Sequence, residues 1–560
     1  MSSIEYSSPS PDLQFVQSDL LAYIFSNPHN IPSDKVVYID ALSKEKITFG
    51  EVVRRTQCLA AGLRAVGVND SDVVVIYSPN TVEYPIYCFG ILGCRAVVAP
   101  FSPTLTIEEL RTHALTTGAK YVIAHSSLLE NAREAMPGTL VKKLIQADDA
   151  QQPSRGLLDV PTLAELAKGQ VAQQLLHISP REVASRNAFL CLSSGTTGPS
   201  KVVQLSHQNV TTNMQQYMAI PTLEFSPSAI YVAFIPNYHI AGIIINVLLP
   251  VFGGALMVMM PHFELEKYLW LLQHHKATTI SIIPPVALLL SRSPLAEKYD
   301  LGSLQRTFCT AAPLPKEVKA DFDARMKKLY GKDILLLQGY GSTETSPLVA
   351  QVPYWRQDKS HTCGCSVPNM SMRLIDPLTG RDVPKNASAR MPGEIWVRGP
   401  NVMSGSYRNA DATEAAFENG WYKTGDLAVI DSDGYLTIMD RIKELIKYKG
   451  LQVVPSELEN KILQHPNVQD ATVVGVWKDA EATEVPAAFV VLQTGSGPVL
   501  ETVGKVKAWF DREVANHQKL RGVVFAVEAI PKSASGKILR RQVKEMVQAR
   551  ARSKGLKAMI

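Results

Sequence analysis

Apolar residues gather in short runs along roughly the first 340 positions, and stretches with helical spacing separate these runs. The runs at 73–77, 96–100, 121–124, 188–192, 278–283 and 334–338 have the length and composition of buried strands. Between two of them, Thr106 and Glu109 form a capping box, which predicts a helix that ends near Gly118. The alternation predicts an α/β fold in which helices cover both faces of the sheets.

The pattern changes after Asp440. A lysine-rich hairpin is expected at 441–454, followed by a helix that starts at Pro455, where Ser456 and Glu459 form a second capping box. Strand-like runs follow at 471–476 and 487–492. The sequence therefore predicts a large N-terminal domain, residues 1–440, and a small α+β C-terminal domain, residues 441–560.

An uncharged stretch at 240–260 is long enough to span a bilayer. It is interrupted, however, by Asn246, Pro250, Gly253 and Gly254. We interpret it as a buried helix that ends near Pro250, a Gly-Gly turn and a strand at 255–260. Stable insertion into a membrane is therefore not expected.

The composition is that of an ordinary globular protein. The chain has 560 residues, enough for two to four domains, and its 46% hydrophobic and 19% charged residues exclude a disordered chain. A net charge of +5 is small for this length, so no nucleic-acid partner is expected. The seven cysteines are scattered without a zinc or disulfide framework, which fits a reducing, cytoplasmic compartment.

The segment 193–201 carries the clearest chemical signal. It has the sequence Ser-Ser-Gly-Thr-Thr-Gly-Pro-Ser-Lys and directly follows the predicted strand at 188–192. Glycines let backbone N–H groups turn toward an anion, hydroxyls add donors and the lysine adds positive charge. Composition alone leaves a flexible surface loop as an alternative. The residues predicted to bind phosphate are Ser193, Ser194, Gly195, Thr196, Thr197, Gly198 and Lys201.

A second segment, Gln-Gly-Tyr-Gly-Ser-Thr-Glu at 338–344, follows the run at 334–337. Tyr340 offers a stacking face for a purine. Thr343 is a candidate donor to a phosphate, and Glu344 is a candidate ligand for Mg²⁺, which favours carboxylates together with phosphates. Further along the chain, Asp426 offers a carboxylate that suits a ribose diol. Each segment on its own is also compatible with an ordinary turn.

Together these segments resemble the motifs of the adenylate-forming superfamily, which includes acyl- and aryl-CoA synthetases, peptide-synthetase adenylation domains and beetle luciferases. The similar segments, at 193–201, 338–344, 422–426 and 532–537, follow one another in the family's order. The likeness is strongest to 4-coumarate–CoA ligase-like enzymes. It implies an acid–CoA ligase that uses ATP, Mg²⁺ and CoA. Such an enzyme first activates an acid as acyl-AMP, releasing pyrophosphate, and then transfers the acyl group to CoA as a thioester.

The resemblance also implies roles for individual residues. The catalytic residues would be Lys537, Thr343, Glu344 and His239, with Glu344 as the metal ligand, and Asp440 would be the hinge of a mobile C-terminal lid. Besides the loop at 193–201, the ATP or AMP site would comprise Ala311, Ala312, Pro313, Gln338, Gly339, Tyr340, Gly341, Thr343, Asp426, Arg441, Lys447 and Gln452. CoA would contact Lys449 and Gly450. The acyl pocket would comprise His239, Ile240, Ala241, Gly339, Gly341 and Pro347.

Two features bear on the identity of the acid. No Asp or Glu occurs from 231 to 261, which argues for an uncharged acyl chain. Ala241 stands where 4-coumarate–CoA ligases usually carry Tyr, which implies a wider or deeper pocket. We therefore expect an aryl or medium-chain acid. The alternatives are transfer of the acyl group to a carrier protein or an amine, a luciferase-like oxygenase, and a binding protein without catalytic activity.

The expected partners are small molecules: the acid, ATP and CoA. The C-terminal tripeptide Ala558-Met559-Ile560 faintly resembles a peroxisomal address, so a peroxisomal localisation is an alternative to a cytoplasmic one. The oligomeric state is left open by the sequence.

Overall fold

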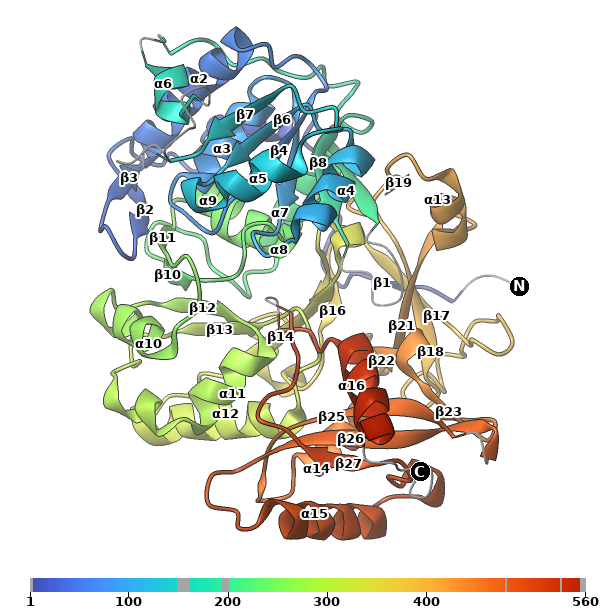
Figure 1. Cartoon of the computed structure of the whole chain (residues 1–560). Coiled ribbons are helices and arrows are strands. Elements are labelled where there is room, and N and C mark those ends of the chain that lie inside the picture. The colour runs from blue at the N-terminus through green and yellow to red at the C-terminus, as the bar shows by residue number, and fades with distance from the viewer. Residues whose placement is uncertain are drawn as a thin grey trace.

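The computed structural model describes residues 4–148, 161–168, 170, 172–193, 201–478, 481–533 and 536–553. A large N-terminal part carries four sheets among these residues, and a smaller C-terminal part carries a three-stranded sheet with its helices and a short hairpin. In Figure 1 the C-terminal part, coloured red, lies below the N-terminal part. The α/β architecture predicted from the sequence is confirmed.

The first sheet positions the predicted phosphate loop between two of its strands. Its strand order is β19-β9-β8-β5-β4-β6-β7, and β8, β5, β4, β6 and β7 run parallel. The predicted runs match β4 and β6, and differ by one residue from β5 and β8. The strands are β4 (Val73–Tyr77), β5 (Val97–Phe101), β6 (Tyr121–Ala124), β7 (Lys143–Gln146), β8 (Asn187–Leu192), β9 (Val202–Ser206) and β19 (Gly405–Ser406).

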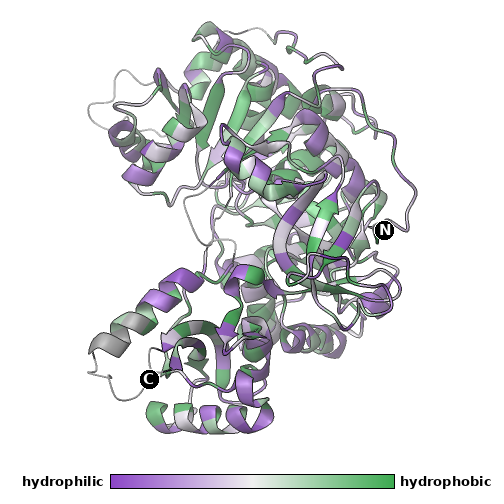
Figure 2. Ribbon diagram, turned by 90° about the vertical axis from the view of Figure 1, so that its right-hand side faces the viewer, coloured by the Kyte–Doolittle hydropathy of each residue, from purple (hydrophilic) through white to green (hydrophobic). Residues whose placement is uncertain are grey.

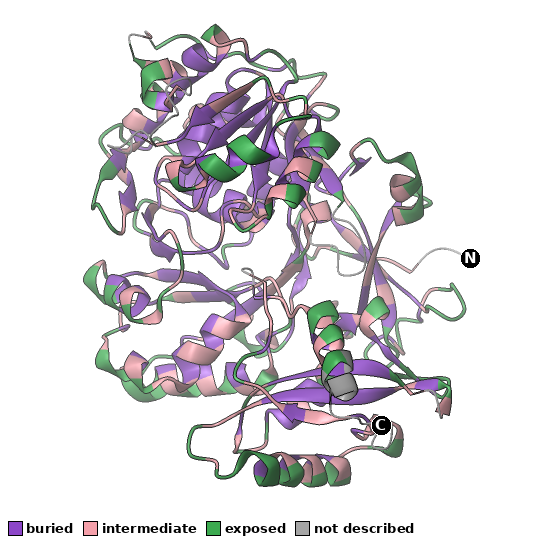
Figure 3. Cartoon of the chain, in the orientation of Figure 1, coloured by how far each residue is buried: buried purple, intermediate pink, exposed green. Residues whose placement is uncertain are grey.

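Helices cover both faces of this sheet, as the apolar runs predict. On β4, Val74 and Ile76 pack into one cluster with α2 (Phe49–Ala65) and α3 (Tyr84–Leu92). The alternate residues, such as Val75, face α4 (Ile107–Thr117) and α5 (Leu129–Ala135). The predicted capping box at the start of α4 is present, and Gly118 ends that helix. Figure 3 shows these strands as buried and parts of α4 and α5 as exposed.

Two further sheets continue the N-terminal part. One has the order β10 (Ile230–Ala233), β11 (Leu256–Met259), β2 (Val36–Asp40) and β3 (Lys46–Thr48). The other has the order β12 (Thr279–Ile282), β13 (Arg306–Cys309), β14 (Leu336–Gly341), β15 (Leu348–Gln351) and β16 (Cys365–Ser366). A shared core joins them to α10 (Leu265–His274), α11 (Pro284–Arg292) and α12 (Lys316–Tyr330).

The glycine-rich segment after the predicted strand at 334–337 is not a free loop. Gly339, Tyr340 and Gly341 belong to β14 and pair antiparallel with β15, with a bulge between Tyr340 and Gly341. The alternative of an ordinary turn is therefore wrong for these three residues. The strand continues because the neighbouring strand β15 satisfies the backbone groups of this segment.

The segment 240–253 is a buried helix, as predicted, but it ends later than expected. It consists of α8 (Ile240–Gly242), a π-helical segment η2 (Ile243–Leu248) and α9 (Leu249–Gly253). Pro250 does not end the helix, because it lies in the first turn of α9, where a missing N–H is tolerated. Among the described residues, no helix combines the length and the apolar character needed to cross a membrane.

A fourth sheet leads to the C-terminal part. Its path is β1-β17-β18-β21-β20, and β22 pairs with β21, which sets Asp426 opposite Arg441. The strands are β1 (Tyr6–Ser7), β17 (Ser371–Ile375), β18 (Gly393–Arg398), β20 (Phe417–Glu418), β21 (Trp421–Ile430) and β22 (Leu436–Arg441).

The C-terminal part is a small α+β unit, as predicted. Neighbouring residues of β25 face opposite clusters: Val473 packs with α14 and α15, and Val474 packs with α16. The predicted hairpin is β23 (Ile446–Tyr448) with β24 (Leu451–Val453). The other elements are α14 (Pro455–Ile462), β25 (Val468–Lys478), β26 (Thr483–Leu492), α15 (Val499–Glu513), β27 (Val524–Ala526) and α16 (Arg540–Ser553).

Candidate active site

A cavity of about 530 Å³ lies where the two parts meet. Its walls come from α11, α12, β14, β21 and β22 of the N-terminal part and from α14 and the segment 532–540 of the C-terminal part. The cavity therefore depends on the position of the C-terminal part. The predicted site residues that line it are Ala311, Ala312, Pro313, Gln338, Gly339, Tyr340, Gly341, Asp426, Asp440, Arg441 and Lys537.

Asp426 is the centre of a buried polar group on one wall. The Tyr340 hydroxyl donates to Asp426 Oδ2 at 2.7 Å, and Arg441 Nε lies 3.0 Å from Asp426 Oδ1. Burial, together with Asp426, raises the pKa of Tyr340 well above its usual value, so the hydroxyl keeps its proton. A carboxylate has about four acceptor sites, so two hydroxyls of a ribose still find acceptors here.

Lys537 reaches the same region from the C-terminal part. Burial lowers the pKa of its ammonium, and the positive charge of Arg441 lowers it further, whereas Glu344 and Asp426 oppose the shift. The approach is tight: a Cβ on Gly536 would lie 2.9 Å from Cδ1 of Ile283, and Gly536 has a φ of +80°. Glycine is therefore required immediately before the lysine. The structure brings Lys537 into the electrostatic neighbourhood of Arg441, Asp426 and Glu344.

Glu344 lies in a short 3₁₀ turn after β14, Thr343–Thr345. Its backbone carbonyl accepts a hydrogen bond from Met403 N at 2.7 Å, which fixes the turn. The described residues contain no group of three or more His, Cys, Asp and Glu side chains that would enclose a metal. A single carboxylate fits Mg²⁺, which usually binds through one or two carboxylates, water and substrate phosphates.

His239 lies at the start of α8 and is close enough to Lys537 to sense its charge. Burial and the charge of Lys537 lower the pKa of His239 to about 4, so its imidazole is neutral near pH 7. Ile240 and Ala241 follow it in α8. On β14, a Cβ on Gly341 would lie 1.8 Å from the carbonyl oxygen of Pro347, so only glycine fits there. Of the residues predicted for the acyl pocket, Gly339 and Gly341 line the cavity, whereas His239, Ile240, Ala241 and Pro347 are not among the residues that line it.

Other predicted residues lie apart from the cavity wall. Lys447 and Gln452 are exposed and face each other across the β23–β24 hairpin. Lys449 Nζ forms an ion pair with Glu481 Oε2 at 2.8 Å, and Gly450 follows in the turn of the hairpin with a φ of +83°. These four residues are not among the residues that line the cavity in this arrangement. Their contacts with phosphate and CoA therefore stay predictions.

Of the predicted phosphate loop, the structure describes only the first and last residues, Ser193 and Lys201. Ser193 N donates to the carbonyl oxygen of Lys201 at 2.9 Å, which continues the antiparallel pairing of β8 with β9. The predicted residues Ser194, Gly195, Thr196, Thr197 and Gly198 lie outside the described residues, as does the C-terminal tripeptide at 558–560.

Asp440, the predicted hinge, links the two parts through its carboxylate. Oδ2 accepts from Ser456 N at 2.9 Å and Oδ1 accepts from Arg441 N at 2.8 Å. Burial raises the pKa of Asp440 to about 6, although Arg540 and these hydrogen bonds oppose the shift. The predicted capping box of Ser456 and Glu459 is absent, because Ser456 Oγ bonds the carbonyl of Met439 and Glu459 pairs with Arg540. The network around Arg540 is missing from the sequence prediction, since its members are far apart in the chain.

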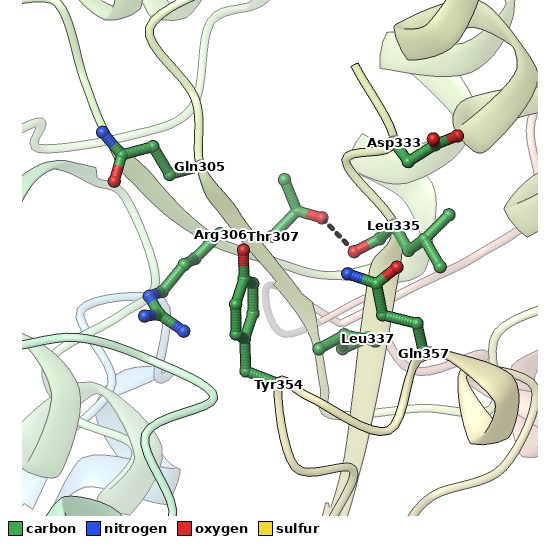
Figure 4. Close-up of a pocket in the computed structure, with 8 residues that line it drawn as sticks. All are labelled: Gln305, Arg306, Thr307, Asp333, Leu335, Leu337, Tyr354 and Gln357. Atoms are coloured by element: carbon green, nitrogen blue, oxygen red, sulfur yellow. Dashed lines mark hydrogen bonds between the residues drawn. The ribbon is translucent and has the colours of Figure 1, made fainter.

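A second, shallow pocket lies on a different part of the 5-stranded sheet, among β13, β14 and the loop at 353–357 (Figure 4). Its volume is about 10 Å³, which leaves room for no more than a water molecule. The guanidinium of Arg306 lies 4.0 Å from the centre of the Tyr354 ring and bonds Glu224, and Thr307 Oγ1 donates to the carbonyl of Leu335. These contacts are satisfied by the protein itself, so we assign them a structural role.

With this geometry in place, comparison with known proteins identifies the family. The family model "AMP-binding enzyme" matches residues 25–407, and the model "AMP-binding enzyme C-terminal domain" matches residues 457–537. The first match alone covers more than half of the chain. The protein therefore belongs to the AMP-binding enzymes.

Individual proteins show how far the similarity extends along the chain. A probable 4-coumarate–CoA ligase 2 of Dictyostelium discoideum is 34% identical over 539 residues, which is 94% of each chain. The 4-coumarate–CoA ligase 2 of Nicotiana tabacum is 33% identical over 95% of this chain and 94% of its own. The structure of ATP-bound MatB from Rhodopseudomonas palustris is similar with a TM-score of 0.82 and 26% identity, over 94% of this chain and 98% of that one. The two-part fold is thus shared over nearly the whole chain.

Proposed function

We propose that this protein is an ATP-dependent acid–CoA ligase that activates an aryl or medium-chain carboxylic acid. One observation carries the proposal: Lys537 of the C-terminal part lines the same cavity as Asp426 and Arg441, which form an ion pair there. Membership in the AMP-binding enzymes supports the use of ATP. The similarity to proteins named 4-coumarate–CoA ligases supports CoA as the acceptor.

In the first step, a carboxylate oxygen of the acid attacks the α-phosphorus of ATP. The bond from that phosphorus to the bridging oxygen breaks, and pyrophosphate leaves. Negative charge grows on the α-phosphate, where Lys537 and Arg441 supply fixed positive charge in a buried setting. Asp426 accepts from the ribose hydroxyls, and Tyr340 holds Asp426 in place. Mg²⁺, held by Glu344 and the phosphates, would neutralise charge on the leaving pyrophosphate.

In the second step, the sulfur of CoA attacks the acyl carbon, its proton passes to solvent, and AMP leaves. Lys449 and Gly450 are the proposed CoA contacts. Since Lys449 and Gly450 are not among the residues that line the cavity, contact of these residues with CoA at the acyl carbon would require the C-terminal part to move. We place the boundary of the two domains after Asp440, which lies in the interval 408–456 that neither family model covers.

The acid is proposed to be uncharged beyond its carboxylate. The segment from 231 to 261 carries no acidic side chain, and His239 at the start of α8 is neutral near pH 7. Ala241 is small, which leaves space for an aryl ring or a medium alkyl chain.

The test is pyrophosphate release from Mg-ATP with a panel of aryl and medium-chain acids, with and without CoA, and with the products followed by mass spectrometry. An acyl-CoA product supports the ligase and identifies the acid. Acyl-AMP or AMP without acyl-CoA points to a carrier protein or an amine as the acceptor. If no acid in the panel supports turnover, the proposal is wrong.

A further inference from the structure

The segment that carries Lys537 is anchored at both ends by ion pairs. Before it, Lys532 Nζ lies 2.6 Å from Asp470 Oδ2 on β25, and the backbones of Lys532 and Ile538 form a bridge. The turn is closed by Ser533 N, which donates to the carbonyl of Lys537 at 2.8 Å. Beyond it, Arg540 begins α16. The reach of Lys537 is therefore set by how these two anchors are held.

Arg540 is the stronger anchor, because three segments of the C-terminal part converge on its guanidinium. It binds Glu459 of α14 through both terminal nitrogens, at 2.5 and 3.1 Å. The same guanidinium donates to the carbonyl of Val473 on β25 at 2.7 Å. Its Nε lies 2.6 Å from Oε2 of Glu444. The side chains of Arg540, Glu444 and Glu459 are only 13%, 15% and 10% exposed. A buried, bidentate pair of this kind fixes orientation as well as distance.

The Arg540–Glu444 pair connects the two cations of the site. Lys537 lies three residues before Arg540, and Arg441 lies three residues before Glu444. Arg441 in turn is held by Asp426 at 3.0 Å. One ion pair thus joins the segment that presents Lys537 to the segment that presents Arg441. Moving either end of this pair changes the distance between the two cations.

We propose that Arg540 is a positioning residue for acyl-adenylate formation: through Glu444 and Glu459 it sets Lys537 and Arg441 at a fixed separation over the α-phosphate. This inference rests on the proposed function. Arg540 contacts no substrate in this assignment and acts only through the two other cations. The thioester step, in which the C-terminal part has moved, does not need this arrangement.

The experiment compares Arg540→Met, Arg540→Lys and Glu444→Gln with a matched control, Arg541→Met. Arg541 is the next residue in α16, its side chain is 78% exposed, and it pairs along its own helix with Glu545. Two rates are measured: acid-dependent exchange of pyrophosphate into ATP, and thioester formation from synthetic acyl-AMP and CoA. Since misplacing a reacting group by about 1 Å costs about 10²-fold, we expect Arg540→Met to lose about 10² in exchange. The thioester rate should change less than about threefold, and Arg540→Lys should recover part of the exchange.

Arg540→Met leaves two buried carboxylates without their partner, so the lid itself is monitored. Competitive acetylation of the protein without substrates gives the reactivity of Lys537 relative to Lys505, which is 65% exposed. We expect this ratio to rise severalfold in Arg540→Met, to rise less in Glu444→Gln, which keeps its shape, and to stay unchanged in Arg541→Met. Thermal unfolding selects variants that retain the folded C-terminal part.

The outcomes separate the two proposals. If the wild type shows no acid-dependent exchange, the proposed function fails, whereas the acetylation ratio still tests whether Arg540 places Lys537. If folded Arg540 variants lose both rates equally, or keep the wild-type acetylation ratio, Arg540 is only a structural residue and the inference is overturned.

Discussion

The seven-stranded sheet of the N-terminal part and the three-stranded sheet of the C-terminal part are stabilised in different ways. All five residues of β4 are buried, and apolar helices cover both of its faces. In the C-terminal part, apolar clusters are smaller and the buried ions of Arg540, Glu459 and Glu444 hold the elements together. Figure 2 shows the hydrophobic strands of the N-terminal part and the hydrophilic stretches of the helices in the C-terminal part.

The contacts between the two parts are also polar. Gln464 Nε2 donates to Glu317 Oε1 at 2.8 Å, Ser456 bonds Asp440 and Met439, and Lys537 enters the cavity. Breaking a polar contact costs little net free energy, because water replaces the lost partner. Exposing apolar surface to water costs more. The difference supports the proposal that the C-terminal part moves relative to a fixed N-terminal platform.

The largest effect on stability is expected in the platform. Phe189 is fully buried and belongs to β8, the strand that precedes the predicted phosphate loop in the chain. Phe189→Ala leaves a cavity and should lower the free energy of unfolding of the N-terminal part by about 3–5 kcal/mol. Urea unfolding followed by circular dichroism measures it, with Phe189→Leu as the control. A loss below about 1 kcal/mol would contradict the rigid-platform interpretation.

Among substitutions that keep the fold, the largest effect on activity is expected for Lys537, which lines the cavity from the C-terminal part. Lys537→Ala should reduce pyrophosphate exchange by about 10²–10³-fold, because the developing charge on the α-phosphate loses a buried cation. The unfolding temperature should not fall, since burial disfavours the ammonium. Lys505→Ala, on the surface of α15, is the control. Near-normal exchange in Lys537→Ala refutes its catalytic role.

Asp440 lies between the two parts, and its titration should make the free energy of unfolding depend on pH. Its folded pKa of about 6 lies above the usual 3.8, so the folded state binds the proton more tightly than the unfolded chain. The stability that this proton contributes is present below about pH 4 and is lost as the pH rises through about 6. Relative to Asp440→Asn, the wild type should therefore lose up to about 3 kcal/mol over this interval. A difference that does not change with pH, measured by urea unfolding at several pH values, would falsify this assignment.

The smallest effect is expected for a single contact between the parts. Gln464→Ala removes one hydrogen bond to Glu317 and should favour the detached C-terminal part by about 1 kcal/mol, or about fivefold. Limited proteolysis in the segment 441–454 should accelerate by this factor. Lys461→Ala, whose partner Glu513 lies within the C-terminal part, should leave the cleavage rate unchanged. Equal rates for the two variants would show that the Gln464 contact does not hold the parts together.

The fold was predictable where burial alone determines structure. The runs at 73–77 and 121–124 became β4 and β6 without a shift, because parallel strands buried on both faces have continuous apolar sequence. Prediction failed where distant segments compete for local groups. Ser456 and Glu459 have the sequence of a capping box. However, the Ser456 hydroxyl donates to the carbonyl of Met439, and Glu459 forms an ion pair with Arg540. At Gly339 and Gly341 the sequence also allowed a turn, and pairing with β15 excludes that alternative.

The site shows the same division. Motifs local in sequence led to Asp426, Tyr340, Arg441 and Lys537, which the structure brings to one cavity. The positioning group Glu444–Arg540 spans 96 residues of sequence and carries no local signal. The roles assigned to Lys447, Gln452, Lys449 and Gly450 stay predictions, since they concern a pose or a ligand that this arrangement does not contain.

The carboxylate of Asp440 also affects how often the protein adopts each arrangement of its two parts. Helix α14 begins after Val454 and lacks a side-chain cap of its own, and Asp440 supplies the acceptor for Ser456 N instead. Rotation about Asp440 would uncap this helix, at a cost of about 1 kcal/mol. Even without substrate, the protein would then spend about five times longer in the adenylating arrangement on this account alone. With Asp440 as the hinge, we therefore expect the resting enzyme to be biased toward its first half-reaction.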